Sequence, residues 1–255
     1  VYEMSSFQLF DITKSPQVAV CLMVTEDHLD WHKDLVEYQS AKANIFKFQR
    51  PQDIAVFYAD DPVSSELALK SPSNTKYSYG AEADVRFDSD TINAFGQEII
   101  KVSEVGLPGP HNLQNISAAI CAVWEFTQDI DSIAESIKSF KGLPYHIEFI
   151  AEKNGAKYYN DSFSTNPTSA IAAFRSFDSP LVVFFGGYDK NADFKELANE
   201  LKSRNIRKII TYGQTGKRIY EEFRSAGLEN IEYIEGSDFD KIIKAGSDAS
   251  KSGDI

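Results

Sequence analysis

Lys42 is the residue of this sequence whose placement most clearly suggests chemistry. On a helix that turns by about 100° per residue, it falls within an apolar stripe formed by Leu35, Tyr38, Ala41, Ile45 and Phe46. A lysine in apolar surroundings loses its proton easily and can then react covalently, for example with carbon dioxide to give a carbamate. Such a carbamate would turn a cation into a metal ligand. The periodicity equally allows a lysine at the core edge whose ammonium reaches solvent.

The run from Thr25 to His32 is a second candidate, because carboxylates and imidazoles follow directly on an apolar stretch, residues 17–24, that is typical of a buried strand. Loops at the carboxyl ends of strands are where open α/β sheets bind ligands. Carboxylate oxygens joined by one imidazole suit a magnesium or nucleotide site. The alternative interpretation is an acidic helix N-terminus capped by Thr25.

Asn112 and Asn115 lie three residues apart at the predicted start of a helix, and therefore on one face of it. A side-chain amide offers a donor and an acceptor together, which suits the edge of an adenine base. Taken alone, the pair is equally typical of a helix cap beside an exposed asparagine.

Two polar loops, residues 160–167 and 186–193, each follow a predicted strand and precede a predicted helix. Such loops converge on one rim of a parallel sheet. Gly186 and Gly187 allow the backbone to approach a ligand closely, and Lys190 supplies a positive charge for a carboxylate or phosphate. A tight turn between strand and helix would explain the two glycines without a ligand.

The stretch from Gly213 to Arg218 is similar to a phosphate-binding loop, but its spacing is too short and Arg218 stands where a magnesium-binding Ser or Thr is required. No glycine fingerprint of the dinucleotide-binding type follows any predicted strand.

Strands and helices that alternate along the chain would position these loops. Strands are predicted over residues 17–24, 53–58, 156–160, 181–185, 208–212 and 231–234, and helices over 34–48, 112–127, 167–174, 194–203 and 217–226. Residues 62–104 alternate short β-rich pieces with turn residues, among them 93–96, as in a hairpin region. Gly142 and Pro144 indicate a boundary, and the alternation beyond it predicts a doubly wound parallel sheet.

The composition limits the class of protein. A chain of 255 residues can bury two cores, and a formal net charge of -12 argues against a nucleic-acid partner, because such binding depends on Lys and Arg neutralising phosphates. The two cysteines lie in apolar runs and indicate a reducing cytoplasm rather than a disulfide framework. No apolar run approaches the roughly 20 residues needed to cross a bilayer, so neither secretion nor a membrane is expected. The chain begins without methionine and stops where a strand is about to start, so we expect a piece of a larger protein.

Six motifs in order along the chain resemble those of the Mur ligases. They are residues 3–9, 24–30, 38–42, 111–115, 160–166 and 186–193. Together they are far more specific than any one of them, and the stretch Glu-Met-Ser-Ser-Phe-Gln-Leu at 3–9 looks like the D-glutamate-adding member of the family.

The resemblance implies an α/β fold with a central ATPase domain, a P-loop type mixed sheet with helices, over residues 1–143, and a Rossmann-like ligase domain over 144–255. It implies a monomer that uses ATP and Mg²⁺ to join D-glutamate to UDP-N-acetylmuramoyl-L-alanine through an acyl phosphate, in the synthesis of peptidoglycan precursors for the cell wall. Magnesium would neutralise the transferring phosphoryl group.

By position in the motifs, the resemblance also assigns roles. Glu3, His28 and a carbamylated Lys42 would form the catalytic metal site. Asn112 and Asn115 would contact adenine, and Asp161 the ribose. Ser5, Thr165 and Lys190 would bind substrate, the last two holding the incoming amino acid.

The sequence departs from the family pattern at several positions. Met23 stands where Asn is usual, Tyr145-His146 where His-Arg is usual, and Phe163 where some members have Lys. An ATP contact from the arginine and one substrate contact are therefore not carried over. The family's UDP-binding domain and ATP-binding loop would precede Val1 and a substrate loop would follow Ile255, so we expect the chain alone to be inactive.

Three other functions remain open. Another ligase of the family, such as a folylpolyglutamate synthase, would keep the chemistry and change the substrate. A nucleotide-binding module that has lost catalysis would keep only the fold. A dehydrogenase is the most distant possibility, since it would have to bind nicotinamide.

Overall fold

The computed structural model describes residues 1–25, 31–188 and 192–255, which fold into two compact units. Unit 1 comprises residues 1–106 and 111–140, and unit 2 comprises residues 107–110 and 141–255. Within these ranges no helix combines the length and the apolar character needed to span a membrane.

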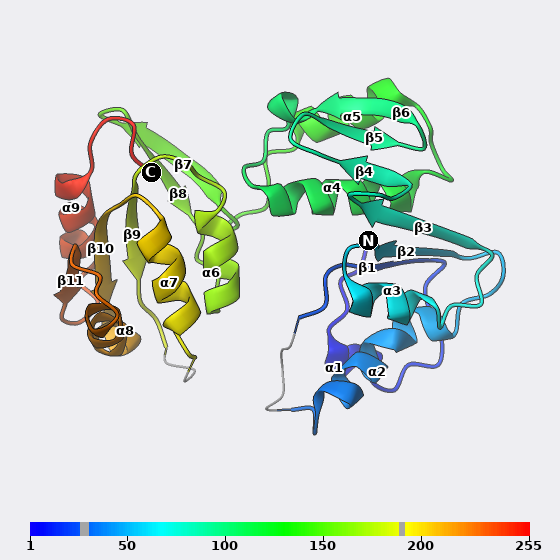
Figure 1. Cartoon of the computed structure of the whole chain (residues 1–255), viewed down its shortest axis with the longest axis horizontal. Helices are drawn as coiled ribbons and strands as arrows, with labels where there is room; N and C mark the ends of the chain where they lie inside the picture. The colour runs from blue at the N-terminus through cyan, green and yellow to red at the C-terminus, as the bar shows by residue number, and fades with distance from the viewer. Residues whose placement is uncertain (26–30, 189–191) are drawn as a thin grey trace. The chain divides into compact units, whose positions relative to one another are not determined.

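Unit 1 is built on a six-stranded mixed sheet in the order β1-β2-β3-β4-β5-β6 (Figure 1). Its strands are β1 (Val18–Cys21), β2 (Ile54–Tyr58), β3 (Thr75–Gly80), β4 (Val85–Phe87), β5 (Thr91–Ala94) and β6 (Gln97–Lys101). The first four strands pair in parallel, and β4, β5 and β6 pair antiparallel. The part of the sheet around β1 and β2 is therefore the parallel region, in which polar loops at the carboxyl ends of strands share one rim.

Helices cover both faces of this sheet. Side chains alternate along β2: Ile54 and Val56 pack with α4 (Pro110–Val123) and α5 (Ile130–Ser139), whereas Ala55 packs with α2 (Leu35–Lys47) and α3 (Pro62–Ala68). A strand that is covered on both faces is apolar throughout rather than alternating. This explains the continuous apolar run in the sequence of β2.

Three of these helices begin at aspartate caps, α5 at Asp129 and the two on the other face as follows. The Asp34 side chain accepts a hydrogen bond from the Glu37 backbone at the start of α2, and Asp61 accepts from Val63 and Ser64 at the start of α3. Such caps satisfy backbone donors that a helix leaves unpaired in its first turn. Each helix therefore begins at a defined residue beside the rim of the sheet.

Unit 2 contains a parallel sheet in the order β11-β10-β9 and a hairpin of β7 and β8. The strands are β7 (Glu148–Lys153), β8 (Ala156–Asn160), β9 (Leu181–Phe185), β10 (Ile206–Tyr212) and β11 (Ile231–Ile234). Residues 254 and 255 join the two parts, because the Asp254 carbonyl accepts from Lys157 in the hairpin and the Ile255 carbonyl accepts from Val182 in β9.

The helices of unit 2 lie on both faces of its sheet. Residues of α6 (Pro167–Phe174), α7 (Lys195–Ser203) and α8 (Gly213–Ser225) pack in one core with Leu181 and Val183 of β9. On the other face, α9 (Phe239–Ala249) brings Gly246 against the Phe184 ring, where an added Cβ would lie 2.2 Å from a ring carbon. The predicted α/β fold, a mixed sheet followed by a doubly wound unit, is confirmed.

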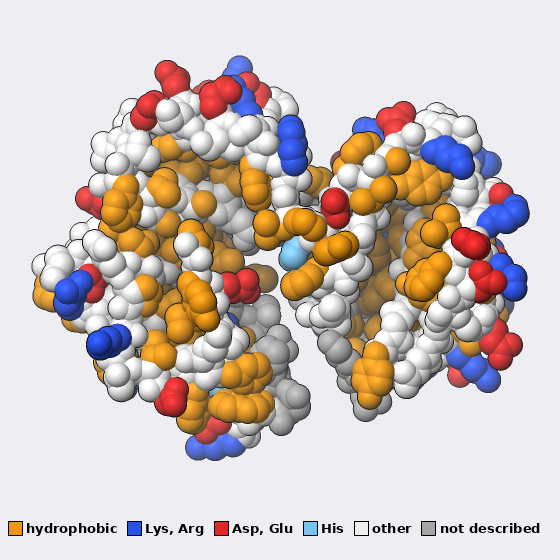
Figure 2. Space-filling model, turned by 180° about the vertical axis from the view of Figure 1, so that it is seen from behind, with side chains coloured by type: hydrophobic (Ala, Val, Ile, Leu, Met, Phe, Trp, Pro, Cys, Tyr) orange, Lys and Arg blue, Asp and Glu red, His pale blue; other side chains and the backbone are white. Residues whose placement is uncertain are grey.

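Charged side chains are spread over the surface of both units. On the face shown in Figure 2, Lys and Arg lie interspersed with Asp and Glu rather than in a single patch, and apolar side chains are also exposed. The exposed apolar residues include Phe149 and Ile150 on β7 and Phe239 and Ile243 on α9.

Some predicted elements differ from the structure. The strand predicted over 17–24 is shorter, the helix predicted over 112–127 begins and ends earlier, and the turn expected at 93–96 is at Phe95-Gly96. The sequence analysis missed α1 (Ser6–Leu9), α3, α5, β7 and α9. Helices α1 and α3 are too short to show a helical period, and β7 is exposed along nearly its whole length, so it lacks an alternating pattern.

Candidate functional site

Lys42 lies on α2 in unit 1 with its side chain half-buried. Its Nζ is 5.1 Å from the centre of the Tyr38 ring, a cation–π distance. Within the described residues its ammonium forms no ion pair. Burial raises the pKa of the nearby Cys21 thiol, and the positive charge of Lys42 acts in the opposite direction. Lys42 therefore lies beside the carboxyl end of β1 with no carboxylate partner in the described parts of the chain.

The motif at residues 3–9 forms the short helix α1 and its cap. Ser5 and Gln8 form a capping box, in which the Gln8 side chain accepts from the Ser5 backbone at 2.9 Å and the Ser5 hydroxyl accepts from the Gln8 backbone at 3.3 Å. Glu3, two residues before the cap, is exposed. The spacing Ser-x-x-Gln is a known helix-start signal that the sequence analysis did not use.

The cluster from Thr25 to His32 is only partly described, since His28 and its neighbours at 26–30 lie outside the described residues. On its N-terminal side, the Val24 backbone donates a hydrogen bond of 2.8 Å to Asp61. On its C-terminal side, the buried His32 places Nε2 2.9 Å from the Ser6 hydroxyl. Asp61 was not predicted, although Asp61-Pro62 is a typical helix start that could have identified it.

Asn112 and Asn115 lie in the first two turns of α4, with Asn112 half-buried and Asn115 exposed. Their spacing of three residues places them on the same side of the helix. Both belong to unit 1, as do Glu3, Ser5 and Lys42. Contact with adenine stays a prediction for this pair.

Asp161 of unit 2 lies at the end of β8, where its carboxylate organises the loop that follows. It accepts hydrogen bonds from the Ile147 backbone at 3.0 Å and from the Ser164 hydroxyl at 2.5 Å. Thr165, the next predicted site residue, is exposed. The carboxylate thus already has two protein partners, a feature that the sequence did not reveal.

The segment facing Asp161 has an unusual backbone. Tyr145 and Ile147 have φ angles of 66° and 46°, in the left-handed region that bulky and β-branched side chains avoid. The hydrogen bond from Ile147 to Asp161 and a second from the Tyr145 backbone to Glu148, of 2.9 Å, hold this conformation. Residues kept in such conformations by their surroundings are concentrated at functional sites.

His146 and Phe163, two of the positions at which the sequence departs from the family pattern, lie in contact. Their rings stack with centres 4.3 Å apart and planes inclined by 28°. Phe163 is 63% exposed, so the pair presents an aromatic surface to solvent rather than filling the core. The two departures therefore form one structural feature.

The Gly186-Gly187 turn follows β9. Gly186 packs against the Tyr212 ring, where an added Cβ would lie 2.6 Å from ring atoms, and Gly187 has a φ of +116°. The buried Thr215 donates from its hydroxyl to the Gly187 carbonyl at 2.8 Å. Both glycines are therefore required by packing and backbone conformation. Lys190, the predicted substrate residue of this loop, lies outside the described residues.

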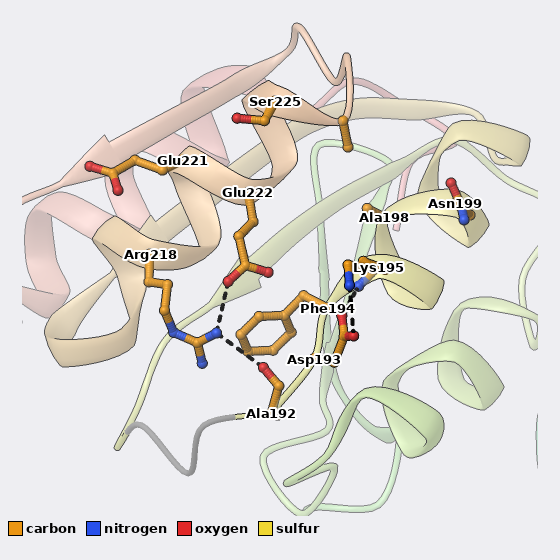
Figure 3. Close-up of a pocket in the computed structure, with 11 residues that line it drawn as sticks. Ala192, Asp193, Phe194, Lys195, Ala198, Asn199, Arg218, Glu221, Glu222 and Ser225 are labelled. Atoms are coloured by element: carbon orange, nitrogen blue, oxygen red, sulfur yellow. Dashed lines mark hydrogen bonds and ion pairs between the residues drawn. The ribbon is translucent and has the colours of Figure 1, made fainter.

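Helix α8 also contacts the C-terminal end of this loop, at Ala192. Ala192 lines a surface cavity of about 680 Å³ between α7 and α8 (Figure 3). Arg218 donates to the Ala192 carbonyl at 3.0 Å, pairs with Glu222 at 2.8 Å, and lies 4.8 Å from the centre of the Phe194 ring. The first turns of α8 thus hold both described ends of the loop.

The same contacts account for the phosphate-loop lookalike at residues 213–218. The Gly213 backbone donates to the Gly236 carbonyl at 2.9 Å, and the Thr215 backbone donates to the Gly187 carbonyl at 3.2 Å. Backbone donors that a phosphate loop would turn toward its ligand are here bound to neighbouring loops of the protein. This agrees with the interpretation that the stretch is not a nucleotide site.

Comparison with known proteins identifies both halves of the chain. Residues 1–123 match the Mur ligase middle domain, and residues 147–255 match the Mur ligase glutamate ligase domain. The UDP-N-acetylmuramoylalanine–D-glutamate ligase of Clostridium kluyveri is 35% identical over 254 residues, which is 98% of this chain and 55% of that protein. The ligase of the same name from Pelotomaculum thermopropionicum is 35% identical over 263 residues, 100% of this chain and 57% of that protein.

Solved structures show the same fold. The Thermotoga maritima UDP-N-acetylmuramate-alanine ligase MurC matches with a TM-score of 0.72 and 16% identity, over 98% of this chain and 57% of that one. The MurF ligase of Thermotoga maritima, solved in complex with ADP, matches with a TM-score of 0.71 and 23% identity, over 94% and 57%. The chain spans little more than half the length of these proteins. With two Mur ligase domains in succession and relatives 35% identical along nearly its entire length, the chain belongs to the Mur ligase family.

Proposed function

We propose that this chain takes part in the ATP-dependent joining of D-glutamate to UDP-N-acetylmuramoyl-L-alanine, a step in the synthesis of peptidoglycan precursors. The observation that carries the proposal is the 35% identity to ligases of that name, which extends through both units rather than one. The motif at residues 3–9, which resembles the D-glutamate-adding member, supports the choice of substrate within the family.

Each unit has a part in this proposal. The central ATPase domain corresponds to residues 1–143 and the ligase domain to residues 144–255. Asn112 and Asn115, with their amides on one face of α4, would contact the adenine of ATP. Asp161 would contact the ribose while it keeps the Ile147 and Ser164 contacts, because a carboxylate can accept several hydrogen bonds.

Magnesium fits the donor chemistry of the predicted residues. Glu3 offers an exposed carboxylate and His28 an imidazole, the kinds of ligand expected to hold the ion. Among the described residues, no group of three or more His, Cys, Asp or Glu side chains is arranged to hold a metal. A carbamate on Lys42 would add a ligand from a residue type outside that set. When bound, the ion neutralises charge on the transferring phosphoryl group.

The surroundings of Lys42 allow the carbamate. The neutral amine of Lys42 would add to the carbon of carbon dioxide and release one proton, which leaves an N-carboxylate with a negative charge. The half-buried position and the absence of an acidic partner within the described residues are compatible with this reaction, whereas the cation–π contact with the Tyr38 ring favours the ammonium form and would be given up. An ion pair would instead hold the lysine protonated.

The chain's own residues would otherwise orient the substrates. In the proposed reaction, the alanyl carboxylate first receives the terminal phosphoryl group of ATP and ADP leaves. The amine of D-glutamate then attacks that carbonyl carbon, phosphate leaves, and the amine loses a proton. Ser5, Thr165 and Lys190 would hold the substrates in place, since correct orientation supplies much of the rate of such a reaction.

The test is phosphate release from ATP by the complete reading frame that contains this chain, supplied with UDP-N-acetylmuramoyl-L-alanine and a panel of amino acids. We expect release that depends on D-glutamate. Release with a different acceptor would keep the family and change the substrate.

A non-catalytic nucleotide-binding module is the second candidate, and the His146–Phe163 stack favours it. The family resemblance leads one to expect arginine at position 146 and, in some members, lysine at position 163, whereas this chain has an aromatic pair. Absence of phosphate release with every acceptor, together with retained ATP binding, would support this candidate.

A further inference from the structure

Helix α1 carries the segment that begins with Glu3 and Ser5, but it cannot hold its position unaided. It is a single turn of four residues, and such short helices are unstable alone because forming the first turn fixes many dihedral angles for few hydrogen bonds. Its capping box satisfies local donors only. What places α1 relative to the rest of unit 1 must therefore come from contacts with other elements.

Beside the ring contacts of Phe7 and Phe10 with Trp31 and His32, hydrogen bonds to other elements are made at each end of α1. At its N-terminal end, the buried Ser6 hydroxyl meets His32 Nε2 at 2.9 Å. At its C-terminal end, the Asn44 side chain donates to the carbonyls of Leu9 and Phe10, at 2.9 and 3.2 Å. His32 thus fixes the end of the helix next to Glu3 and Ser5, and Asn44 fixes the opposite end.

The surroundings of His32 hold its ring in a single orientation. Its side chain is fully buried, its ring lies parallel to Phe7 at 5.8 Å between centres, and it meets the Trp31 ring edge-on at 4.5 Å. Nδ1 is 3.6 Å from the Glu37 carboxylate. At that distance Nδ1 makes no hydrogen bond to any described residue, so the contact between Nε2 and the Ser6 hydroxyl is the hydrogen bond that the ring makes within the described chain.

His32 also contacts the residue beneath Lys42. The Tyr38 ring meets the His32 ring edge-on with centres 5.4 Å apart, and the Lys42 Nζ lies 5.1 Å from the same tyrosine ring. A continuous set of packed side chains therefore runs from Ser6 through His32 and Tyr38 to Lys42. It connects the two predicted parts of the site in unit 1.

We propose that His32 is a positioning residue of the ligase reaction, which holds Glu3 and Ser5 at a fixed distance from Lys42 through its hydrogen bond to Ser6. The role rests on the proposed function, and it requires no contact between substrate and His32, whose side chain is fully buried. A displacement of about 1 Å at a reacting centre can lower a rate by about 10²-fold, so this single hydrogen bond has a measurable effect.

The test compares His32→Phe, which keeps the ring and removes its nitrogens, with His32→Gln, whose amide can reach the place of Nε2. In the complete enzyme we expect His32→Phe to lower kcat/KM for the UDP-linked substrate by about 10²-fold, with KM for ATP changed less than about twofold. His32→Gln should recover most of the loss. Ser6→Ala should reproduce the His32→Phe effect, and the double variant should be no worse than either single one, because both remove the same contact.

Asn44→Ala is the matched control, because it releases the other end of α1 and leaves Ser6 in place. It should lower Tm as much as His32→Phe or more while changing kcat/KM little. Equal kinetic losses in both variants, or additive losses in the Ser6 and His32 pair, would overturn the proposal and leave His32 a purely structural residue.

Hydrogen exchange of the backbone amides in residues 1–12 measures how firmly α1 is held, and it does not depend on catalytic activity. Exchange in this segment should be faster in His32→Phe than in the wild type and close to wild type in His32→Gln; unchanged exchange would overturn the proposal. If the wild-type enzyme shows no D-glutamate-dependent release, the proposed function fails, and the exchange result still decides whether His32 anchors α1.

Discussion

Two polar segments that the family resemblance assigns to substrates, residues 3–9 of unit 1 and residues 160–167 of unit 2, are held in different ways. The first is fixed by residues distant in the sequence, since Ser6 meets His32 and the end of α1 meets Asn44. The second is organised by a carboxylate of the segment itself, that of Asp161, which accepts hydrogen bonds from Ile147 and Ser164.

The difference shows how each segment can respond to its ligands. Buried hydrogen bonds, such as the one between His32 and Ser6, are rigid because an unpaired polar group in the interior is costly. A carboxylate beside a strained backbone can exchange protein partners for ligand donors, and Tyr145 and Ile147 have φ angles that require support. We infer that the segment in unit 1 is preorganised and that the one in unit 2 depends on charge.

The strongest test of unit 1 is Lys42→Ala in the complete enzyme. Because the carbamate would supply negative charge at the metal site, its loss should lower kcat by at least about 10³-fold. The measurement is D-glutamate-dependent phosphate release, with and without bicarbonate. Lys47→Ala, an exposed lysine at the end of the same helix, is the control and should retain activity. Wild-type turnover that is unaffected by removing bicarbonate would contradict the carbamate.

Unit 2 is expected to depend on the ion pair between Arg207 and Asp254, which lies where residues 254 and 255 join the hairpin to the sheet. Asp254 is 1% exposed, so Asp254→Ala leaves the partly exposed arginine and the Lys251 backbone donor without their acceptor and should destabilise unit 2 measurably. Urea unfolding followed by hydrogen exchange in each unit would measure this. Equal destabilisation of unit 1 would show that the two units do not unfold separately.

The same ion pair predicts a pH dependence. The hydrogen bond from Arg207 lowers the pKa of Asp254 below its ordinary value, so the unfolded chain binds a proton more readily than the folded one. Its contribution to the free energy of unfolding is therefore complete above the ordinary carboxyl pKa, about pH 4, and is lost as pH falls through the lower folded value. Asp254→Asn should flatten this part of the stability profile of unit 2. An unchanged profile would contradict the assignment.

Asp161→Ala should have a smaller effect on stability and a clear one on activity. Removal of the carboxylate leaves the Ile147 backbone and the Ser164 hydroxyl without their acceptor, at a cost of about 2 kcal/mol. We expect a lower Tm together with a higher KM for ATP. Asp161→Asn, which keeps one acceptor oxygen, should recover part of the stability. A variant that lost stability and bound ATP normally would restrict Asp161 to a structural role.

The smallest effect is expected at Thr215. Thr215→Val keeps the shape of the side chain and removes the hydroxyl that binds the Gly187 carbonyl, which should destabilise unit 2 by about 1 kcal/mol. Since this contact holds one end of the loop that carries Lys190, KM for D-glutamate should rise while KM for ATP does not. Thr215→Ser is the control that keeps the hydroxyl, and it should behave as the wild type.

Much of the fold could be predicted because its signals are local. The apolar run of β9, the helical period of α2 and the turn residues that separate successive elements are each recognised from neighbouring residues in the sequence. The alternation of strands and helices then indicates a parallel sheet. The elements that were missed, such as the single turn of α1 and the exposed strand β7, lack a period long enough to read. Helix α1 is held by contacts with residues distant in the sequence, whereas β7 is held by its pairing with the next strand, β8.

The sequence by itself determined the order of the motifs, and with it the family and the residue types available for chemistry. Only the tertiary structure decided that His32 meets Ser6 and that His146 stacks on Phe163, which brings two departures from the family pattern together. It also decided that Thr215 and Arg218 bind the ends of a loop instead of a phosphate. The hydrogen bonds among these contacts join residues that lie far apart along the chain, and such pairings arise when packed elements bury polar groups that must then find partners.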